Sequence, residues 1–132
     1  MEKREQMNVL WFDELHRSDV NLVGGKSSSL GEMTSAMKIP VPYGFATTTH
    51  AYRQFMAETG LNDQINKLLA EINDYENADE LHRVCSHIRQ MIVEAPMPSE
   101  IAMTIKKAYA ALSEKMGETE PFVAIRSSAT AE

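Results

Sequence analysis

The chain has 132 residues, enough for one domain or part of one, and its apolar fraction of 43% is sufficient for a buried core. A formal net charge of −6 argues against a general nucleic-acid binder, which needs a basic surface to displace counterions from phosphates. Since no apolar run approaches the ~20 residues of a membrane span and the charged start lacks a secretory core, we expect a cytoplasmic protein without membrane partners.

The N-terminal part predicts a short strand followed by a helix. Residues 9–12 are an apolar run of strand length. Further on, Leu30, Met33 and Met37 have helical spacing, which predicts a helix over residues 27–37 with the preceding serines as N-caps. The Gly24-Gly25-Lys26 motif therefore lies where a loop is expected to become a helix.

The middle of the chain predicts a connector, a second strand and several helices. Pro40 and Pro42 exclude a helix over residues 39–43, and residues 44–46 predict a short strand. Apolar spacing, glycines and prolines then predict four helices. The first carries Tyr52, Phe55 and Met56 and ends near Gly60, and the second lies near residues 63–72. The third covers about residues 78–93, and the fourth is capped by Ser99 and runs through Leu112.

The C-terminal part predicts a buried strand over Phe122-Val123-Ala124-Ile125, after Pro121. A hydroxyl-rich stretch led by Arg126 follows this strand and continues to Glu132. Together these elements predict an α+β arrangement that is rich in helices and contains a few strands.

The Gly24-Gly25-Lys26 motif is the first of two places that could hold a phosphate. Two glycines let backbone N–H groups approach an anion, the following helix directs its positive end at the motif, and Lys26 adds a full charge. The spacing of a Walker A loop is absent. Taken alone, the motif is more often a simple turn before an amphipathic helix.

The second place is Arg126 with Ser127, Ser128 and Thr130. A guanidinium group presents a planar fork that can bind two phosphate oxygens, and hydroxyl groups add further donors. The alternative is a surface arginine in a polar segment. The combination of the two motifs, in this order, carries more weight than either one.

Three separated stretches make the chain resemble the N-terminus of the phosphoenolpyruvate synthase and pyruvate phosphate dikinase family. The resemblance runs from about Leu10 to the last residue. The stretches that carry it are Val23-Gly24-Gly25-Lys26-Ser27-Ser28-Ser29-Leu30-Gly31-Glu32-Met33, Ile39-Pro40-Val41-Pro42-Tyr43-Gly44-Phe45-Ala46-Thr47-Thr48 and Phe122-Val123-Ala124-Ile125-Arg126-Ser127-Ser128-Ala129-Thr130-Ala131-Glu132.

The resemblance implies the N-terminal subdomain of an ATP-grasp-like nucleotide-binding domain. It implies that Lys26 and Arg126 contact ATP phosphates, and that ATP phosphorylates a histidine on a separate swivelling domain. His16, His50, His82 and His87 match no family motif, so none is expected to be that histidine. The magnesium ligands of the family lie further downstream, and we expect neither a metal ligand nor a catalytic residue within this segment.

The resemblance also implies that residues 1–132 are a partial ATP-binding domain, truncated at its C-terminal end. We expect a fragment of a longer protein or a small subunit completed by another chain, inactive when isolated. The expected acceptor is pyruvate, with phenol, as in phenylphosphate synthase, and rifamycin antibiotics, as in rifampin phosphotransferase, as alternatives. A further alternative is a non-catalytic nucleotide-site subunit completed by a partner chain. Ser27 stands where many phosphoenolpyruvate synthases have asparagine, which leaves the acceptor open.

Overall fold

A computed structural model describes residues 3–131 and divides the chain into two compact units. The first unit consists of Met1–Arg53 and Ser99–Glu132, and the second consists of Gln54–Pro98. Helices predominate, and one two-stranded sheet accompanies them. The predicted helix-rich α+β class is therefore confirmed. In the part of the chain described, no helix is both long and apolar enough to cross a lipid bilayer.

The sheet of the first unit pairs strands β1 (Val9–Trp11) and β2 (Phe45–Thr47) in antiparallel orientation. Leu10 lies opposite Ala46 in this register, and both residues are buried. Both strands occur where the apolar runs at residues 9–12 and 44–46 predict them. Because a two-stranded sheet is only marginally stable in water, it depends on the helices packed against it.

Helix α1 (Val20–Ser35) packs against β2 and against two short 3₁₀ turns, η2 (Phe12–Glu14) and η3 (Arg17–Asp19). A further 3₁₀ turn, η1 (Arg4–Gln6), precedes the sheet. The small core between these elements consists of Leu10, Leu15, Val23 and Ala46, with Met7, Phe12 and Leu22 partly buried around it.

The helix predicted over residues 27–37 was placed too late, because α1 already begins at Val20. Its first turn carries Val23, which is only 2% exposed. Burial of this side chain is a tertiary contact, and the spacing of Leu30, Met33 and Met37 gave no sign of it. The backbone is not continuously helical, since Gly24 interrupts α1 with φ 84° and ψ 172°.

Helix α5 (Ser99–Met116) also belongs to the first unit and contacts β1. Its buried residues are Ile101, Ala108 and Leu112, which recur at helical spacing along the helix that the sequence predicts. Lys115, near the end of α5, holds its ammonium nitrogen 3.9 Å from the centre of the Trp11 ring. This cation–π contact adds to the apolar packing of α5 on β1.

Helix α2 (Thr49–Glu58) begins in the first unit and continues into the second. The hydroxyl oxygen of Thr48 accepts a hydrogen bond from the Ala51 N–H at 3.2 Å, and the Thr48 hydroxyl donates to the Met7 carbonyl at 2.6 Å. Thr48 therefore caps the start of α2. Gly60 follows the end of α2 with φ 71°, as the predicted helix stop requires.

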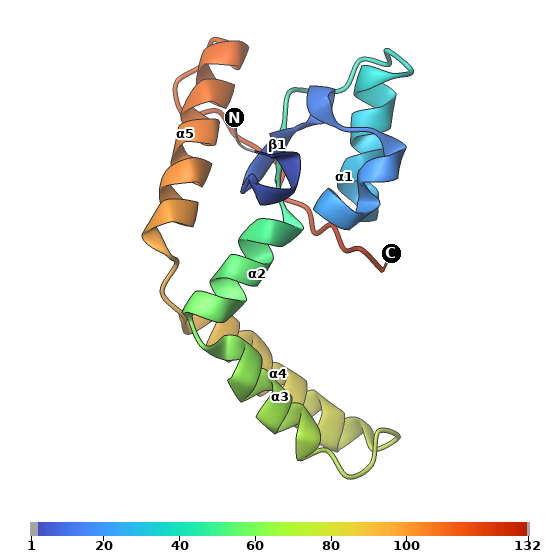
Figure 1. Cartoon of the computed structure of the whole chain (residues 1–132), viewed down its shortest axis with the longest axis vertical. Coiled ribbons are helices and arrows are strands. Elements are labelled where there is room, and N and C mark those ends of the chain that lie inside the picture. The colour runs from blue at the N-terminus through green and yellow to red at the C-terminus, as the bar shows by residue number, and fades with distance from the viewer. Residues whose placement is uncertain (1–2, 132) are drawn as a thin grey trace. The chain divides into compact units, whose positions relative to one another are not determined.

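The second unit is a helical hairpin of α3 (Leu61–Ala70) and α4 (Ala78–Glu94), which lie side by side (Figure 1). The Asn77 side chain caps α4 by accepting from the N–H groups of Asp79 and Glu80. Leu61, Ile72 and Val84 are buried within the unit. Both helices lie within one continuous stretch of the chain, and both occur near their predicted bounds.

The buried strand predicted over residues 122–125 is wrong, because residues 121–129 form no regular secondary structure. Phe122 is fully exposed and Ile125 is 91% exposed. A strand needs a neighbour for its backbone groups, and within residues 3–131 the strands β1 and β2 pair only with each other. The start of this segment is fixed by the Tyr109 hydroxyl, which donates to the Pro121 carbonyl at 2.8 Å.

Candidate functional site

The break at Gly24 lies inside the first predicted phosphate motif. Its φ of 84° and ψ of 172° belong to a region that only glycine adopts readily. The helix resumes over residues 25–35, so Gly25 and Lys26 occupy the first turn of its second segment. The motif therefore does lie at a helix start, but this start is an internal break in α1 and not a loop-to-helix junction.

The C-terminal motif docks on this break through three hydrogen bonds. The Ser128 hydroxyl donates to the Val23 carbonyl at 2.7 Å and accepts from the Ser27 N–H at 3.0 Å. The Gly25 N–H donates to the Ala129 carbonyl at 3.0 Å. These bonds join residues that are more than 100 positions apart, and Figure 1 shows the C-terminal segment passing the start of α1.

The close approach of the two motifs also explains why residue 24 is a glycine. A Cβ atom at Gly24 would lie 2.6 Å from the Ser128 carbonyl carbon and 2.6 Å from its hydroxyl oxygen. Both distances are far shorter than a normal contact, so a side chain at this position would separate the segments. The absence of a side chain at Gly24 is therefore a condition for the docking of Ser128.

Lys26 and Arg126, the two predicted phosphate ligands, belong to these joined motifs. Both side chains are exposed. Within residues 3–131 neither makes a hydrogen bond or an ion pair. The structure thus brings the two motifs together at the backbone and leaves both positive charges without a neutralising carboxylate, available to an anionic ligand.

The capping role of Ser128 was missed by the sequence analysis. The serines after Lys26 were predicted as N-caps, but they lie inside α1, and the Ser28 hydroxyl donates to the Gly25 carbonyl at 3.0 Å. The hydroxyl that accepts from the helix start belongs to Ser128. Local sequence patterns cannot predict this cap, because Ser128 lies 101 residues after Ser27 in the chain. The Gly25 and Ser27 N–H groups, expected to face an anion, are consequently occupied.

An ion pair fastens the N-terminal segment to the beginning of α1. The Arg4 guanidinium binds both carboxylate oxygens of Asp19, at 2.9 and 3.3 Å, and also donates to the Glu14 carbonyl at 2.8 Å. The hydrogen bond from Arg4 holds the pKa of Asp19 below its usual range against the opposing effect of burial, and a bond from the His16 N–H adds to the lowering. This pair stabilises the turn that precedes α1.

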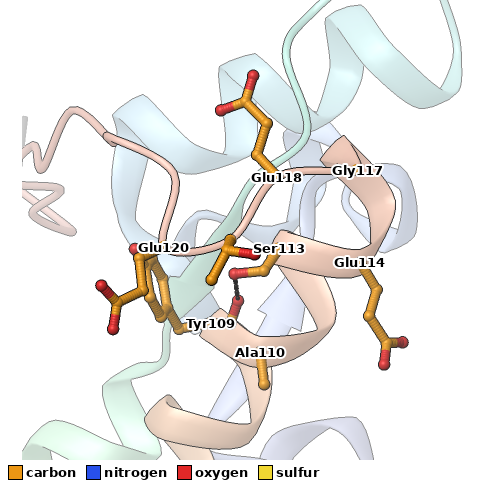
Figure 2. A pocket seen from close by; sticks show the side chains of 8 residues that line it. Tyr109, Ala110, Ser113, Glu114, Gly117, Glu118 and Glu120 are labelled. Atoms are coloured by element: carbon orange, nitrogen blue, oxygen red, sulfur yellow. Dashed lines mark hydrogen bonds between the residues drawn. The ribbon is translucent and has the colours of Figure 1, made fainter.

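A separate hollow lies at the end of α5 and does not suit phosphate. It is lined by Tyr109, Ser113, Glu114, Gly117, Glu118 and neighbouring residues. In Figure 2 the labelled glutamate side chains point in different directions, away from one another. Correspondingly, no three His, Cys, Asp or Glu side chains gather to hold a metal ion anywhere in residues 3–131. Negative charge here would repel a nucleotide.

A known protein family matches most of the chain. Residues 20–132 match the pyruvate phosphate dikinase AMP/ATP-binding domain family, and this match includes both Lys26 and Arg126. The matched range also contains the break at Gly24 and the docking residue Ser128. Every residue of the candidate site therefore lies within the family match.

Similar proteins are phosphoenolpyruvate synthases of archaea and bacteria. A probable phosphoenolpyruvate synthase of Methanocaldococcus jannaschii is 47% identical over 94% of this chain and 10% of the relative. The phosphoenolpyruvate synthases of Neisseria meningitidis and Escherichia coli are 45% and 44% identical, each over 94% of this chain and 16% of the relative. The chain spans less than a fifth of the length of these relatives. Because residues 20–132 match its family model, the chain belongs to the pyruvate phosphate dikinase AMP/ATP-binding domain family.

Proposed function

We propose that this chain forms the front part of the ATP-binding domain of a phosphoenolpyruvate synthase, in which Lys26 and Arg126 contact the phosphates of Mg·ATP. The observation that carries the proposal is the docking of Ser128, two residues after Arg126, on the helix break beside Lys26. Two exposed cations on adjoining segments suit a polyphosphate, whose charge is spread over several oxygens.

The chemistry of phosphoryl transfer supports this assignment. Such a reaction requires positioning and charge neutralisation more than covalent participation by the protein. The Arg126 guanidinium can bind two phosphate oxygens in one plane, and the Lys26 ammonium on its flexible stem can follow a phosphate as it moves. Because Lys26 lies in the first turn of a helical segment, the dipole of that segment adds to its attraction for anions.

The finer parts of the proposal follow from the family. They are an ATP-grasp-like domain, magnesium ligands further along the protein, a phosphohistidine on a swivelling domain, and a cytoplasmic location. Pyruvate is the proposed acceptor, because the relatives described above are named phosphoenolpyruvate synthases. Phenol and rifamycin antibiotics are the acceptors to test against it.

We further propose that residues 1–132 are one part of the nucleotide site, and that the rest comes from further protein. The exposed apolar side chains of Phe122 and Ile125 support this, because their burial against another segment would be favourable. The isolated chain would then bind Mg·ATP weakly, with a dissociation constant in the millimolar range, or roughly −4 kcal/mol. It would have two phosphate contacts and no assembled adenine pocket.

A titration of the isotope-labelled chain with Mg·ATP, followed by NMR, tests the location of the site. The largest shifts are expected at Gly25, Lys26 and Arg126, and both Lys26→Ala and Arg126→Ala should reduce them. Lys107→Ala is the matched control, because Lys107 is an exposed lysine of α5 whose side chain makes no hydrogen bond or ion pair within the described chain. Shifts confined to the second unit, or tight binding by the isolated chain, would contradict the proposal.

A chimera tests whether these residues support the activity. Residues 10–132 would replace the corresponding segment of the Escherichia coli phosphoenolpyruvate synthase, and pyruvate-dependent AMP formation would be measured. The acceptor is tested separately on the assembled enzyme that contains this chain, by comparing AMP formation with pyruvate, phenol and a rifamycin. Pyruvate-dependent AMP formation is expected, and Arg126→Ala should lower it by about a hundredfold, as loss of a desolvated charge-assisted contact of a few kcal/mol implies. Normal turnover by the Arg126→Ala chimera would remove Arg126 from the site.

A further inference from the structure

The geometry points to Ser128 as a positioning residue of the nucleotide site, whose hydroxyl fixes the segment that carries Arg126 on the break at Gly24. This inference rests on the proposed function, because the positioning matters only if Arg126 binds a ligand. It assigns to the second serine of the Arg-Ser-Ser stretch a role different from that of a phosphate donor. Its hydroxyl is already bonded to Val23 and Ser27.

The first argument is that little else holds Arg126 in place. Residues 122–127 are all exposed, and they form no strand. Within residues 3–131, the hydrogen bonds between this end of the chain and α1 come from Ser128 and Ala129. The nearest anchor of the Arg126 backbone is therefore Ser128, two residues away, because the Tyr109–Pro121 hydrogen bond holds the segment five residues before Arg126.

The second argument is that the hydroxyl performs two tasks that no apolar side chain can perform. It accepts from the Ser27 N–H, which is a backbone donor at the start of the second segment of α1, and it donates to the Val23 carbonyl at the end of the first. One oxygen atom thus bridges the two sides of the break. Gly24 has no side chain with which to cap this helix start itself, so Ser128 supplies the missing cap.

The third argument connects the cap to the charges. Ser27 directly follows Lys26, so the hydroxyl that sets the path of the Arg126 segment also orders the turn that carries Lys26. A polyphosphate that contacts both cations would favour the docked arrangement over an undocked one. By linkage, loss of docking must weaken the binding of that ligand.

Amide hydrogen exchange tests whether the hydroxyl fixes the segment, without any ligand. In the wild-type chain the amides of Ser27 and Gly25 should be protected, and Ser128→Ala should accelerate exchange of both by about tenfold, as loss of a net hydrogen bond predicts. Ser127→Ala is the matched control and should change neither. The amides of β1 in the same spectra report whether the first unit is folded.

A double-mutant cycle with Mg·ATP then tests positioning against a purely structural role. Ser128→Ala should lower ATP affinity at least as much as Arg126→Ala does, because it loosens both the Arg126 segment and the turn that carries Lys26, and the double variant should lose clearly less than the sum of the two single losses. This non-additivity is the signature of a residue that acts through Arg126. A structural residue would instead give additive losses.

Each outcome decides the inference. Unprotected Ser27 and Gly25 amides in the wild-type chain, unchanged exchange in Ser128→Ala, or additive losses of affinity would overturn it. If Ser128→Ala unfolds the first unit, recovery of Ser27 protection in Ser128→Thr, which keeps the hydroxyl, would support it. Absence of any ATP-dependent shift in the wild type would contradict the proposed function, while the exchange comparison would still decide whether Ser128 fixes the segment.

Discussion

The hydrogen bonds inside the first unit differ in sequence range from those inside the second unit. In the first unit, the key hydrogen bonds join distant segments, such as Ser128 with Val23 and Thr48 with Met7, which are 105 and 41 residues apart. In the second unit, the bonds are local, such as those of the Asn77 cap, which reach two and three residues along the chain. Every predicted site residue lies in the unit assembled from distant segments.

This difference in range affects how sensitive each unit is to substitution, and the candidate site lies in the more sensitive one. A helical hairpin such as α3–α4 is specified by short-range contacts, so each local signal supports the next. A site made where two distant segments meet depends on a few specific contacts, and loss of one of them affects both partners. A substitution at a contact of the first unit should therefore disturb two segments that are distant in the sequence, whereas one in the second unit should disturb neighbouring residues.

The largest effect is expected for Gly24→Ala, which should destabilise the first unit by about 3 kcal/mol. The variant combines a backbone conformation that only glycine adopts readily with a Cβ atom 2.6 Å from Ser128. Urea denaturation, with hydrogen exchange to identify the unit affected, measures the loss. Gly117→Ala is the control, because Gly117 has φ 67° but open space around it, and it should cost about 1 kcal/mol. Equal losses would show that docking of Ser128 contributes nothing.

The next effect is expected for Leu61→Ala in the second unit, at about 2 kcal/mol. Leu61 is 3% exposed, and its truncation removes apolar burial and leaves a cavity. Amide exchange should accelerate in α3 and α4, while the amides of Gly25 and Ser27 should keep their protection. The control is Leu69→Ala, since Leu69 is 37% exposed and should change stability by well under 1 kcal/mol. Equal loss of protection in both units would contradict their separate stabilisation.

A smaller effect is expected from the Arg4–Asp19 pair as the pH is changed. The folded pKa of Asp19 lies below its unfolded value of about 3.9, so the folded state binds the proton less readily than the unfolded state does. The contribution is therefore fully present above about pH 5 and is lost as the pH falls through the folded pKa. Asp19→Asn should remove part of the acid sensitivity of the first unit, as measured by urea unfolding between pH 3 and 7, on the order of 1 kcal/mol. An unchanged profile would contradict the role of this pair.

The smallest effect on stability is expected for Lys26→Ala and Arg126→Ala, within about 0.5 kcal/mol of the wild type. Both side chains are exposed and unpaired among residues 3–131, so their removal breaks no internal contact. Thermal and urea unfolding measure this directly. A loss above about 1 kcal/mol in either variant would indicate a structural role and weaken its assignment as a ligand residue.

Much of the fold could be predicted from local patterns. Apolar runs located β1 and β2, and Gly60 and the prolines located the ends of several helices. The prediction failed at residues 122–125, where an apolar run has strand composition but no strand beside it among the described residues. Amino-acid composition indicates the propensity of a segment to form a strand, but a strand also needs a neighbouring strand that pairs with its backbone N–H and C=O groups.

By itself, the sequence determined the helix-rich α+β class, and it predicted two candidate phosphate motifs with Lys26 and Arg126 as their charged members. Only the tertiary structure decided that Ser128 docks on the break at Gly24 and that the serines after Lys26 are not the caps of that helix. The physical reason is the range of the interactions. Helical spacing and turn chemistry act over a few residues, whereas the Ser128 hydroxyl bonds to groups more than 100 residues away, which only the folded backbone brings within reach.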